Sequence, residues 1–192
     1  DQNGDGVIND YDSRPIGYAE GGLPYMTYGL NLACSYKGFD IAIDFAGAAL
    51  QSFQRNWETK WPFQAGNTFN YMVEDRWHHE DPLDPSTPWV SGNYPALRPQ
   101  SVNAWHVYCN NSTYWLTNAA YFRMKNLEIG YTIPQKITQK IAMQKFRVFF
   151  NGTNLFSIDN TSKFGLDPEN SDTNGLGYPM VRVLTFGATI TF

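Results

Sequence analysis

The chain has 192 residues, a formal net charge of −4 and an aromatic content of 16%. A chain of this length usually forms one domain or two, and a mild negative charge without a basic run argues against a nucleic-acid surface. No apolar run approaches the roughly 18 residues that a membrane helix needs, so only β-strands could place this chain in a membrane.

The first twelve residues, DQNGDGVINDYD, have the oxygen spacing of a calcium-binding loop. Positions one, three, five, seven, nine and twelve of that loop are Asp1, Asn3, Asp5, the carbonyl of Val7, Asn9 and Asp12. Gly6 holds the sharp-turn position, whereas Asp12 stands where Glu is usual. The spacing is compatible with a structural calcium ion, and a polar turn in which Asn and Asp bond to their own backbone is the alternative.

Two alternating stretches follow and predict a β-hairpin. One face of the first carries Tyr28, Leu30, Leu32, Cys34 and Tyr36, and one face of the second carries Phe39, Ile41, Ile43 and Phe45. A two-residue turn at Lys37-Gly38 places these two apolar sets on the same side.

Three further strands are predicted towards the C-terminus. They cover residues 121–132, with a bulge near Lys125 where the alternation loses its phase, residues 146–155, and the final stretch VRVLTFGATITF. Residues 134–145 between the first two predict a turn with a short helix, because Ile137 and Ile141 lie four apart.

Compact and long connections alternate along these five strands. The compact ones are Lys37-Gly38 and residues 134–145, and the long ones are residues 52–120 and 157–180. A strand meander in a membrane has short turns on one side and long loops on the other. Five strands cannot close a barrel, which needs about eight, so we expect a segment of a larger antiparallel transmembrane β-barrel.

The polar face of the predicted strands is consistent with a water-filled interior. Asn31, Asp40, Asp44 and Glu128 lie opposite the aromatic residues. In a large barrel these side chains would face the lumen and the apolar face would meet lipid. A secreted β-sandwich, stabilised by calcium and binding carbohydrate through loop tryptophans, would expose the polar face instead and remains an alternative.

Several stretches resemble SusC/RagA-type TonB-linked outer-membrane proteins, a nutrient transporter family of Bacteroidetes. They are DQNGDGVINDYD, YGLNL followed by YKGFD, DRWHHEDPLDPSTPW, KNLEIGYTIP, FRVFFNGTNLF and the terminal TFGATITF, and they occur in the family's order over nearly the whole chain. The resemblance implies a barrel of about 22 strands with an N-terminal plug. This chain would supply the last five or so strands and lacks the plug and the TonB box.

The resemblance further implies a location and partners. The protein would be a multi-pass protein of the outer membrane that imports oligosaccharides or peptides, takes energy from TonB through the missing N-terminal part, and is capped by a SusD-like surface lipoprotein. Residues 1–27 would form an extracellular loop, and residues 28–192 would hold the barrel strands with their outer loops. A porin or adhesin barrel without energy coupling is a third hypothesis.

All six tryptophans fall in the long loop 52–120, where they are candidate substrate-binding residues. They are Trp57, Trp61, Trp77, Trp89, Trp105 and Trp115. Flat aromatic faces stack on sugar rings and on peptide side chains. A long loop also needs a small core of its own, and we expect most of these residues to serve that purpose while one or two face the ligand.

The remaining candidate residues carry weaker signals. His78, His79 and Glu80 are expected to form a solvated loop rather than a metal site, and the sequence leaves open whether Cys34 and Cys109 pair. No GxSxG or HExxH arrangement is present, so an enzyme is not expected. Phe186 and Phe192, on an alternating terminal strand, resemble the signal by which the assembly machinery recognises outer-membrane barrels.

Overall fold

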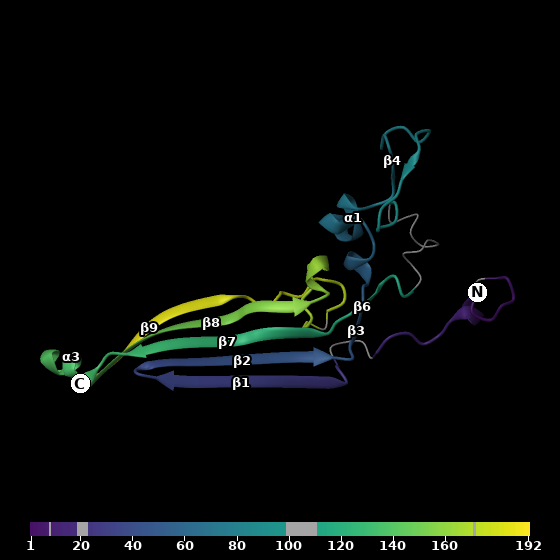
Figure 1. Cartoon of the computed structure of the whole chain (residues 1–192). Helices are drawn as coiled ribbons and strands as arrows, with labels where there is room; N and C mark the ends of the chain where they lie inside the picture. Colours follow the sequence, from purple (N-terminus) through teal and green to yellow (C-terminus); the bar gives the residue numbers. More distant parts are fainter. Residues whose placement is uncertain (8, 19–22, 99–110, 171) are drawn as a thin grey trace.

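A five-stranded antiparallel sheet forms the body of the protein, with the strand order β1-β2-β7-β8-β9 (Figure 1). The computed structural model describes residues 1–7, 9–18, 23–98, 111–170 and 172–192. The strands are β1 (Met26–Tyr36), β2 (Phe39–Ala49), β7 (Tyr121–Thr132), β8 (Lys145–Asp159) and β9 (Val183–Thr191). All five predicted strands are therefore present, and β2 and β8 extend four residues beyond their predicted ends at Phe45 and Leu155.

The predicted hairpin turn is confirmed at Lys37 and Gly38. Both residues have positive φ angles, +47° and +89°, which suits a two-residue hairpin turn between right-twisted strands. The turn sets the register Tyr36↔Phe39, Leu32↔Ile43 and Asn31↔Asp44. The apolar residues of both strands consequently lie on one face of the sheet.

The predicted bulge is confirmed at Lys125. The pairing of β7 with β2 shifts between Met124 and Asn126, and the pairing with β8 shifts at the same place. On β8 the facing position is Asn154, whose φ of +52° marks a second irregularity. The bulge restores the phase, so that Leu127, Ile129 and Tyr131 share the apolar face with Phe122 and Met124.

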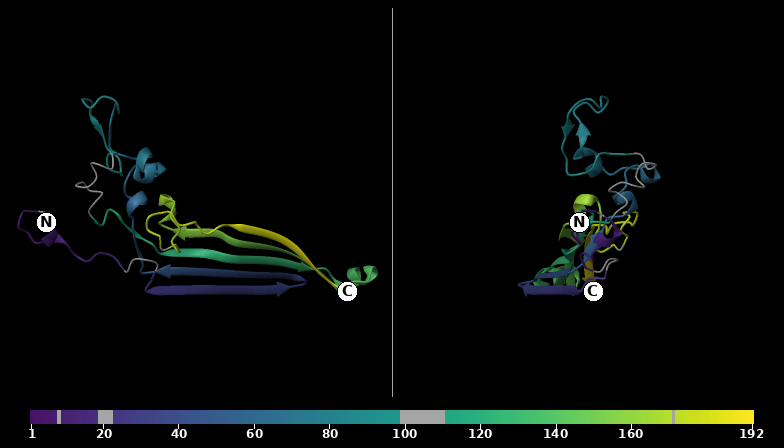
Figure 2. Two further views of the ribbon diagram at one scale, coloured as in Figure 1. Left: turned by 180° about the vertical axis from the view of Figure 1, so that it is seen from behind. Right: turned by 90° about the vertical axis from the view of Figure 1, so that its right-hand side faces the viewer.

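Short turns and long loops lie at opposite ends of the sheet. At one end are the Lys37-Gly38 turn and a short helical turn formed by α3 (Gln135–Thr138) and η4 (Gln139–Ile141). At the other end are the N-terminal segment, the β2–β7 loop and the β8–β9 loop, as Figure 2 shows from behind. This arrangement confirms the alternation read from the sequence.

The β2–β7 loop contains small elements that the sequence pattern did not predict. They are β3 (Ser52–Gln54), η2 (Trp57–Thr59), η3 (Gln64–Gly66), α1 (Asn70–Glu74), β4 (His78–His79), β5 (Trp89–Val90) and β6 (Leu116–Asn118). The N-terminal segment holds η1 (Asp10–Asp12), and the β8–β9 loop holds η5 (Ser162–Phe164). β3 pairs with β6 and so prolongs β2 and β7 into the loop, while β4 and β5 form a small hairpin.

The buried core lies in the loops rather than in the sheet. One cluster consists of Met72, Tyr94 and Trp115, and a second consists of Phe53, Ala119 and Leu166. Leu166 belongs to the β8–β9 loop, so the two long loops pack on each other. Within the described residues, no helix has the length and apolar character needed to span a bilayer.

The apolar face of the sheet remains uncovered. Leu30 is 47% exposed, Phe39 60% and Phe186 79%. A β-sandwich would bury these side chains in a dry centre between two sheets. The alternative of a secreted sandwich is therefore wrong for this chain.

Candidate functional site

Three polar networks follow one another along the polar face of the sheet, and the first surrounds Arg147 near the short turns. Arg147 forms ion pairs with Asp40 of β2 and with Glu128 of β7, the latter at 2.6 Å. Gly130 makes room for this guanidinium, because a Cβ there would lie 2.3 Å from Arg147 Nη2. Arg147 is a partner that the sequence analysis missed, although its alternation with Phe146 and Val148 places it on this face.

The second network lies in the middle of the sheet and consists mainly of amides. Asn31 donates a hydrogen bond to Asp44 at 2.6 Å, and Asn151 donates one to Asn126 at 3.0 Å. Asp40, Asp44 and Glu128 thus share one face, as the alternation requires. Their exposure to a lumen stays a prediction.

The third network ties the β8–β9 loop to the polar face. Arg123 of β7 forms an ion pair with Asp167 at 3.0 Å and contacts Glu169 at 3.6 Å, and Lys125 also pairs with Glu169. The side chains of Arg123, Asp167 and Glu169 are 6%, 7% and 11% exposed. Charges this deeply buried are stable only when they are paired, so the network fixes this loop on the sheet.

The candidate tryptophans occupy different environments. Trp115 is 1% exposed within the first cluster, Trp61 packs against that cluster, and Trp57 contacts Trp61 in a tilted arrangement with ring centroids 5.2 Å apart. Trp77 and Trp89 are about half exposed, and both line a cavity of about 560 Å³. Trp105 lies outside the described residues. Contact with substrate stays a prediction, and the exposed faces favour Trp77 and Trp89.

The N-terminal calcium-like segment folds back on itself. The Asp12 carboxylate accepts hydrogen bonds from the amides of Gln2, at 2.6 Å, and Asn9, at 2.7 Å. The Asp1 carboxylate accepts from the amides of Gly4 and Gly6, both of which have positive φ angles. The described residues contain no group of three or more His, Cys, Asp or Glu side chains placed to hold a metal ion.

The other candidate residues are separate from these networks. His78 Nδ1 lies 2.6 Å from the carbonyl of His79, and the His79 ring lies over Trp89 with centroids 4.0 Å apart. Cys34 is an exposed free thiol, and Cys109 lies outside the described residues. Phe186 on β9 and Phe192 directly after that strand are both more than three-quarters exposed, and their role in assembly stays a prediction.

A single antiparallel sheet with one exposed apolar face, a polar opposite face and long loops at one end is a segment of an outer-membrane-type β-barrel. Two curated relatives from Formosa agariphila, TonB-dependent receptor P3 and TonB-dependent receptor P26, are each 28% identical over the whole chain. The chain is therefore similar over its whole length to a segment of TonB-dependent receptors, and its fold supports the resemblance to the SusC/RagA type. It spans about a fifth of the length of these relatives, 18% and 19%.

Solved structures agree on the fold. The RagAB peptide transporter superposes with a TM-score of 0.56, and the RagAB peptide importer in its "closed-closed" state with a TM-score of 0.60. Each is 22% identical, and each match covers 90% of this chain and 18% of the solved chain. A scan against models of protein families found no match.

Proposed function

We propose that this chain forms part of the wall and outer loops of an outer-membrane importer that takes its energy from TonB. The observation that carries this proposal is the difference between the two faces of the sheet: exposed aromatic and aliphatic side chains on one, and networks of charged and amide groups on the other. Lipid on the first face and water on the second satisfy both. The two curated relatives support the coupling to TonB.

The substrate class that we propose is an oligosaccharide or a peptide that is too large for a simple porin. Uptake of labelled substrate by cells that produce the full-length receptor tests the proposal. Uptake should disappear when either the receptor or TonB is deleted. Uptake that survives the loss of TonB would favour the porin hypothesis instead.

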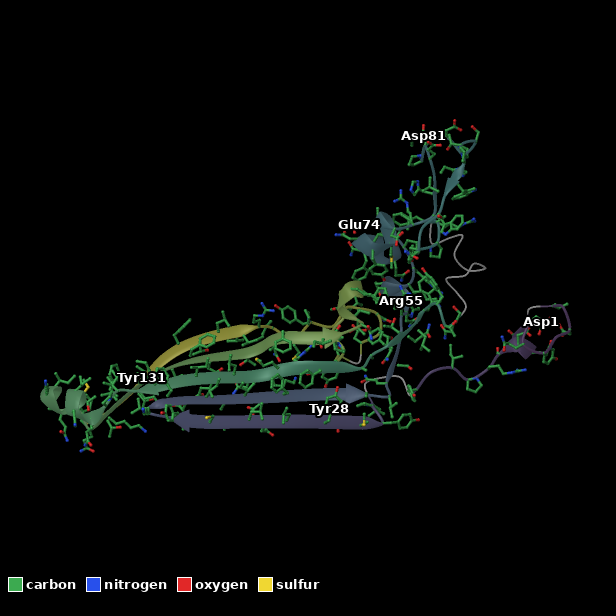
Figure 3. The ribbon with its side chains drawn as sticks, in the orientation of Figure 1. Asp1, Tyr28, Arg55, Glu74, Asp81 and Tyr131 are labelled. Atoms are coloured by element: carbon green, nitrogen blue, oxygen red, sulfur yellow. The ribbon has the colours of Figure 1, made fainter. Side chains whose placement is uncertain are left out.

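We also propose that a SusD-like lipoprotein docks on the loop end of the barrel. The hairpin β4–β5 extends away from the sheet, with Asp81 near its tip (Figure 3), and Leu83 in the same tip is 93% exposed. Trp89 and Val90 of the same hairpin are exposed as well, and apolar residues that cluster on a surface mark interaction sites. A Leu83→Asp variant should co-purify with less lipoprotein than the wild-type receptor, whereas Leu23→Asp, exposed on the N-terminal segment, should retain it.

We further propose that the segment 1–12 binds a structural calcium ion. The closed loop supports this, because each carboxylate oxygen has a second lone pair beside the one that accepts a backbone N–H. Calcium should raise the unfolding temperature of the segment in the intact receptor and slow its cleavage by protease. Asp12→Asn should abolish the calcium effect, and Asp10→Asn, outside the ligand spacing, should preserve it.

A further inference from the structure

Arg55, directly after β3, is a buried cation that forms no ion pair with any carboxylate in the described part of the chain. The residue is 5% exposed, and its guanidinium carbon lies between 4.2 and 5.9 Å from the ring centres of Phe164, Trp115, Tyr114 and Tyr71. Nη2 donates to the carbonyl of Tyr114 at 2.8 Å. Among the described residues, Nε has no hydrogen-bond partner and no carboxylate forms an ion pair with Arg55.

A buried guanidinium without a carboxylate partner raises the free energy of the folded state unless an anion binds to it. Cation–π contacts recover only part of the free energy that a buried charge loses with its hydration shell. The neighbouring charged pairs of this protein show the usual solution, since buried Arg123 is matched by Asp167 and Glu169. Arg55 lacks such a match, although its planar fork of donors is suited to a carboxylate.

Arg55 lines a cavity of about 690 Å³ between the two outer loops. A volume of this order is typical of small-ligand sites. The β2–β7 loop contributes Arg55, Tyr71 and Glu74 to the walls, and the β8–β9 loop contributes Lys163 and Phe164. Figure 3 shows Arg55 at the base of the β2–β7 loop, with Glu74 further from the sheet.

The remaining wall residues suit a ligand that carries many hydroxyl groups. The cavity is also lined by Asn93, Asn118 and Asn160, by Thr117 and by Asp75. Amides both donate and accept hydrogen bonds, and carboxylates accept them from hydroxyl groups. A hydrogen bond from the Asn93 side chain holds the pKa of Asp75 below its usual value, so this carboxylate stays ionised and can accept hydrogen bonds from hydroxyl groups.

A second cavity, lined by the exposed tryptophans, adjoins the Arg55 cavity. The neighbouring cavity lined by Trp77 and Trp89 shares Asn93, Tyr94 and Tyr114 with the Arg55 cavity. Aromatic faces at such a site provide stacking surfaces for flat apolar ligand faces, including those of sugar rings. The two cavities together match a ligand longer than one sugar unit.

We propose that Arg55 binds the carboxylate of an acidic oligosaccharide, with the adjoining sugar units lying over Trp77 and Trp89. This inference deepens the proposed import function by naming the class of substrate. Peptides also carry carboxylates, but the three amides and the hydroxyl-accepting wall favour a sugar. Binding requires no TonB, so it can be measured separately from transport.

Isothermal titration of the purified full-length receptor tests the ligand class. The probes are trigalacturonate, a glucuronate-containing tetrasaccharide, methyl-esterified trigalacturonate and a tetraglutamate peptide. At least one acidic oligosaccharide should bind, and the methyl ester should bind about 10- to 100-fold more weakly, because a charge-assisted hydrogen-bond pair in a buried site is lost. Binding of the peptide alone, equal binding of acid and ester, or no binding of either oligosaccharide would overturn the proposal.

Variants locate the site. Arg55→Gln should weaken binding of the acidic oligosaccharide by about 10- to 100-fold, and Arg55→Lys by an intermediate factor, because lysine keeps the charge but not the fork. Arg14→Gln, on the N-terminal segment, should leave the affinity unchanged. An Arg55→Gln receptor with wild-type affinity would refute the assignment.

A second variant covers the case in which Arg55→Gln disturbs the packing of the loops. Asn160 is an exposed residue at the wall of the cavity, so Asn160→Asp adds a negative charge without touching the buried rings. It should weaken binding of the acidic oligosaccharide and leave the methyl ester unaffected. If TonB-dependent uptake of a neutral substrate persists while these binding tests fail, the assignment of the ligand is wrong but the proposed import function is still supported.

Discussion

Arg147 holds together two acidic groups that would otherwise repel each other across strands β2 and β7. Its removal leaves Asp40 and Glu128 without their cation, while water reaches all three side chains, which are 19%, 33% and 34% exposed. We therefore expect Arg147→Met to lower the free energy of unfolding by about 1–2 kcal/mol, at the low end for hydrogen bonds to charged groups. Urea unfolding of the receptor in detergent measures this.

A combined variant provides the control for this effect. Asp40→Asn and Glu128→Gln added to Arg147→Met remove the acidic partners as well as the cation. Because unpaired charges cost more than absent ones, the triple variant should recover most of the lost stability. A triple variant as unstable as Arg147→Met alone would contradict the ion-pair explanation.

Asp12 gives the N-terminal segment a predictable response to pH. Hydrogen bonds from the backbone amides of Asn9 and Gln2 lower the pKa of this carboxyl below its ordinary value of 3.8. A lowered pKa in the folded state means that the contribution to stability is present above the unfolded value and is lost as pH falls through the folded value. The loop should stay closed at pH 5 and open only as the pH falls below the ordinary pKa range of an aspartate carboxyl.

Hydrogen–deuterium exchange of the 1–12 peptide in the intact receptor, corrected for intrinsic rates, measures this opening. Asp12→Asn should remove the pH dependence of protection at Gln2 and Asn9. Protection that falls already between pH 7 and 5 would indicate that a different group controls the loop.

At the scale of elements, the β1–β2 turn depends on Gly38. Its φ is +89°, and a Cβ would lie 2.8 Å from the carbonyl oxygen of Thr132. Gly38→Ala combines backbone strain with a contact against rigid backbone and should cost about 1–3 kcal/mol. The fraction of receptor that assembles into a heat-modifiable barrel should fall accordingly.

Gly66 offers a matched comparison for that variant. Its φ is +78°, and a Cβ there would meet nothing within 4 Å. Gly66→Ala therefore introduces strain without the steric contact and should be milder. Equal losses in both variants would show that the contact with Thr132 contributes nothing.

The β8–β9 loop is held on the sheet by the network around Arg123. Arg123→Ala leaves Asp167 buried without its ion-pair partner and leaves Glu169 with Lys125 alone, and breaking a buried pair in this way typically costs about 3–5 kcal/mol. Residues 160–182 should then detach locally, and trypsin should cleave faster after Lys163, which is exposed but lies in the folded turn η5. Arg182→Ala, an exposed position in the same loop, should leave the cleavage rate unchanged, and equal cleavage of both variants would argue against the network.

The sequence pattern predicted the five strands of the sheet but not the small elements of the β2–β7 loop, and the difference has a physical reason. Alternation with a period of two identified all five strands of the sheet, because each has one apolar and one polar face. The small elements of the β2–β7 loop have no such period, and their core of Met72, Tyr94 and Trp115 joins residues far apart in the chain. Arg55 gave no local signal at all, since its burial depends on Phe164 from another loop.

At the scale of the whole molecule, the open edges of the sheet determine which surroundings it can tolerate. The edges β1 and β9 each pair on one side only within the described sheet, and unpaired strand edges are not tolerated in hydrocarbon. In the proposed barrel, further strands would therefore continue the sheet at both edges. Within such a barrel the two faces of one strand would meet lipid and water, although their residues adjoin in sequence.

Two adjacent residues at the middle of β1 test this arrangement directly. Leu30 belongs to the apolar face and Asn31 to the polar face, where it contacts Asp44. An arginine on the lipid face at mid-bilayer depth costs about 2–4 kcal/mol, so Leu30→Arg should sharply reduce the compact, heat-modifiable receptor in outer-membrane fractions. Asn31→Arg places the same charge in water beside Asp44 and should assemble normally. If Asn31→Arg were the more damaging of the two, the polar face would have to meet lipid and the apolar face the lumen. The proposed import pathway along the polar face would then be wrong.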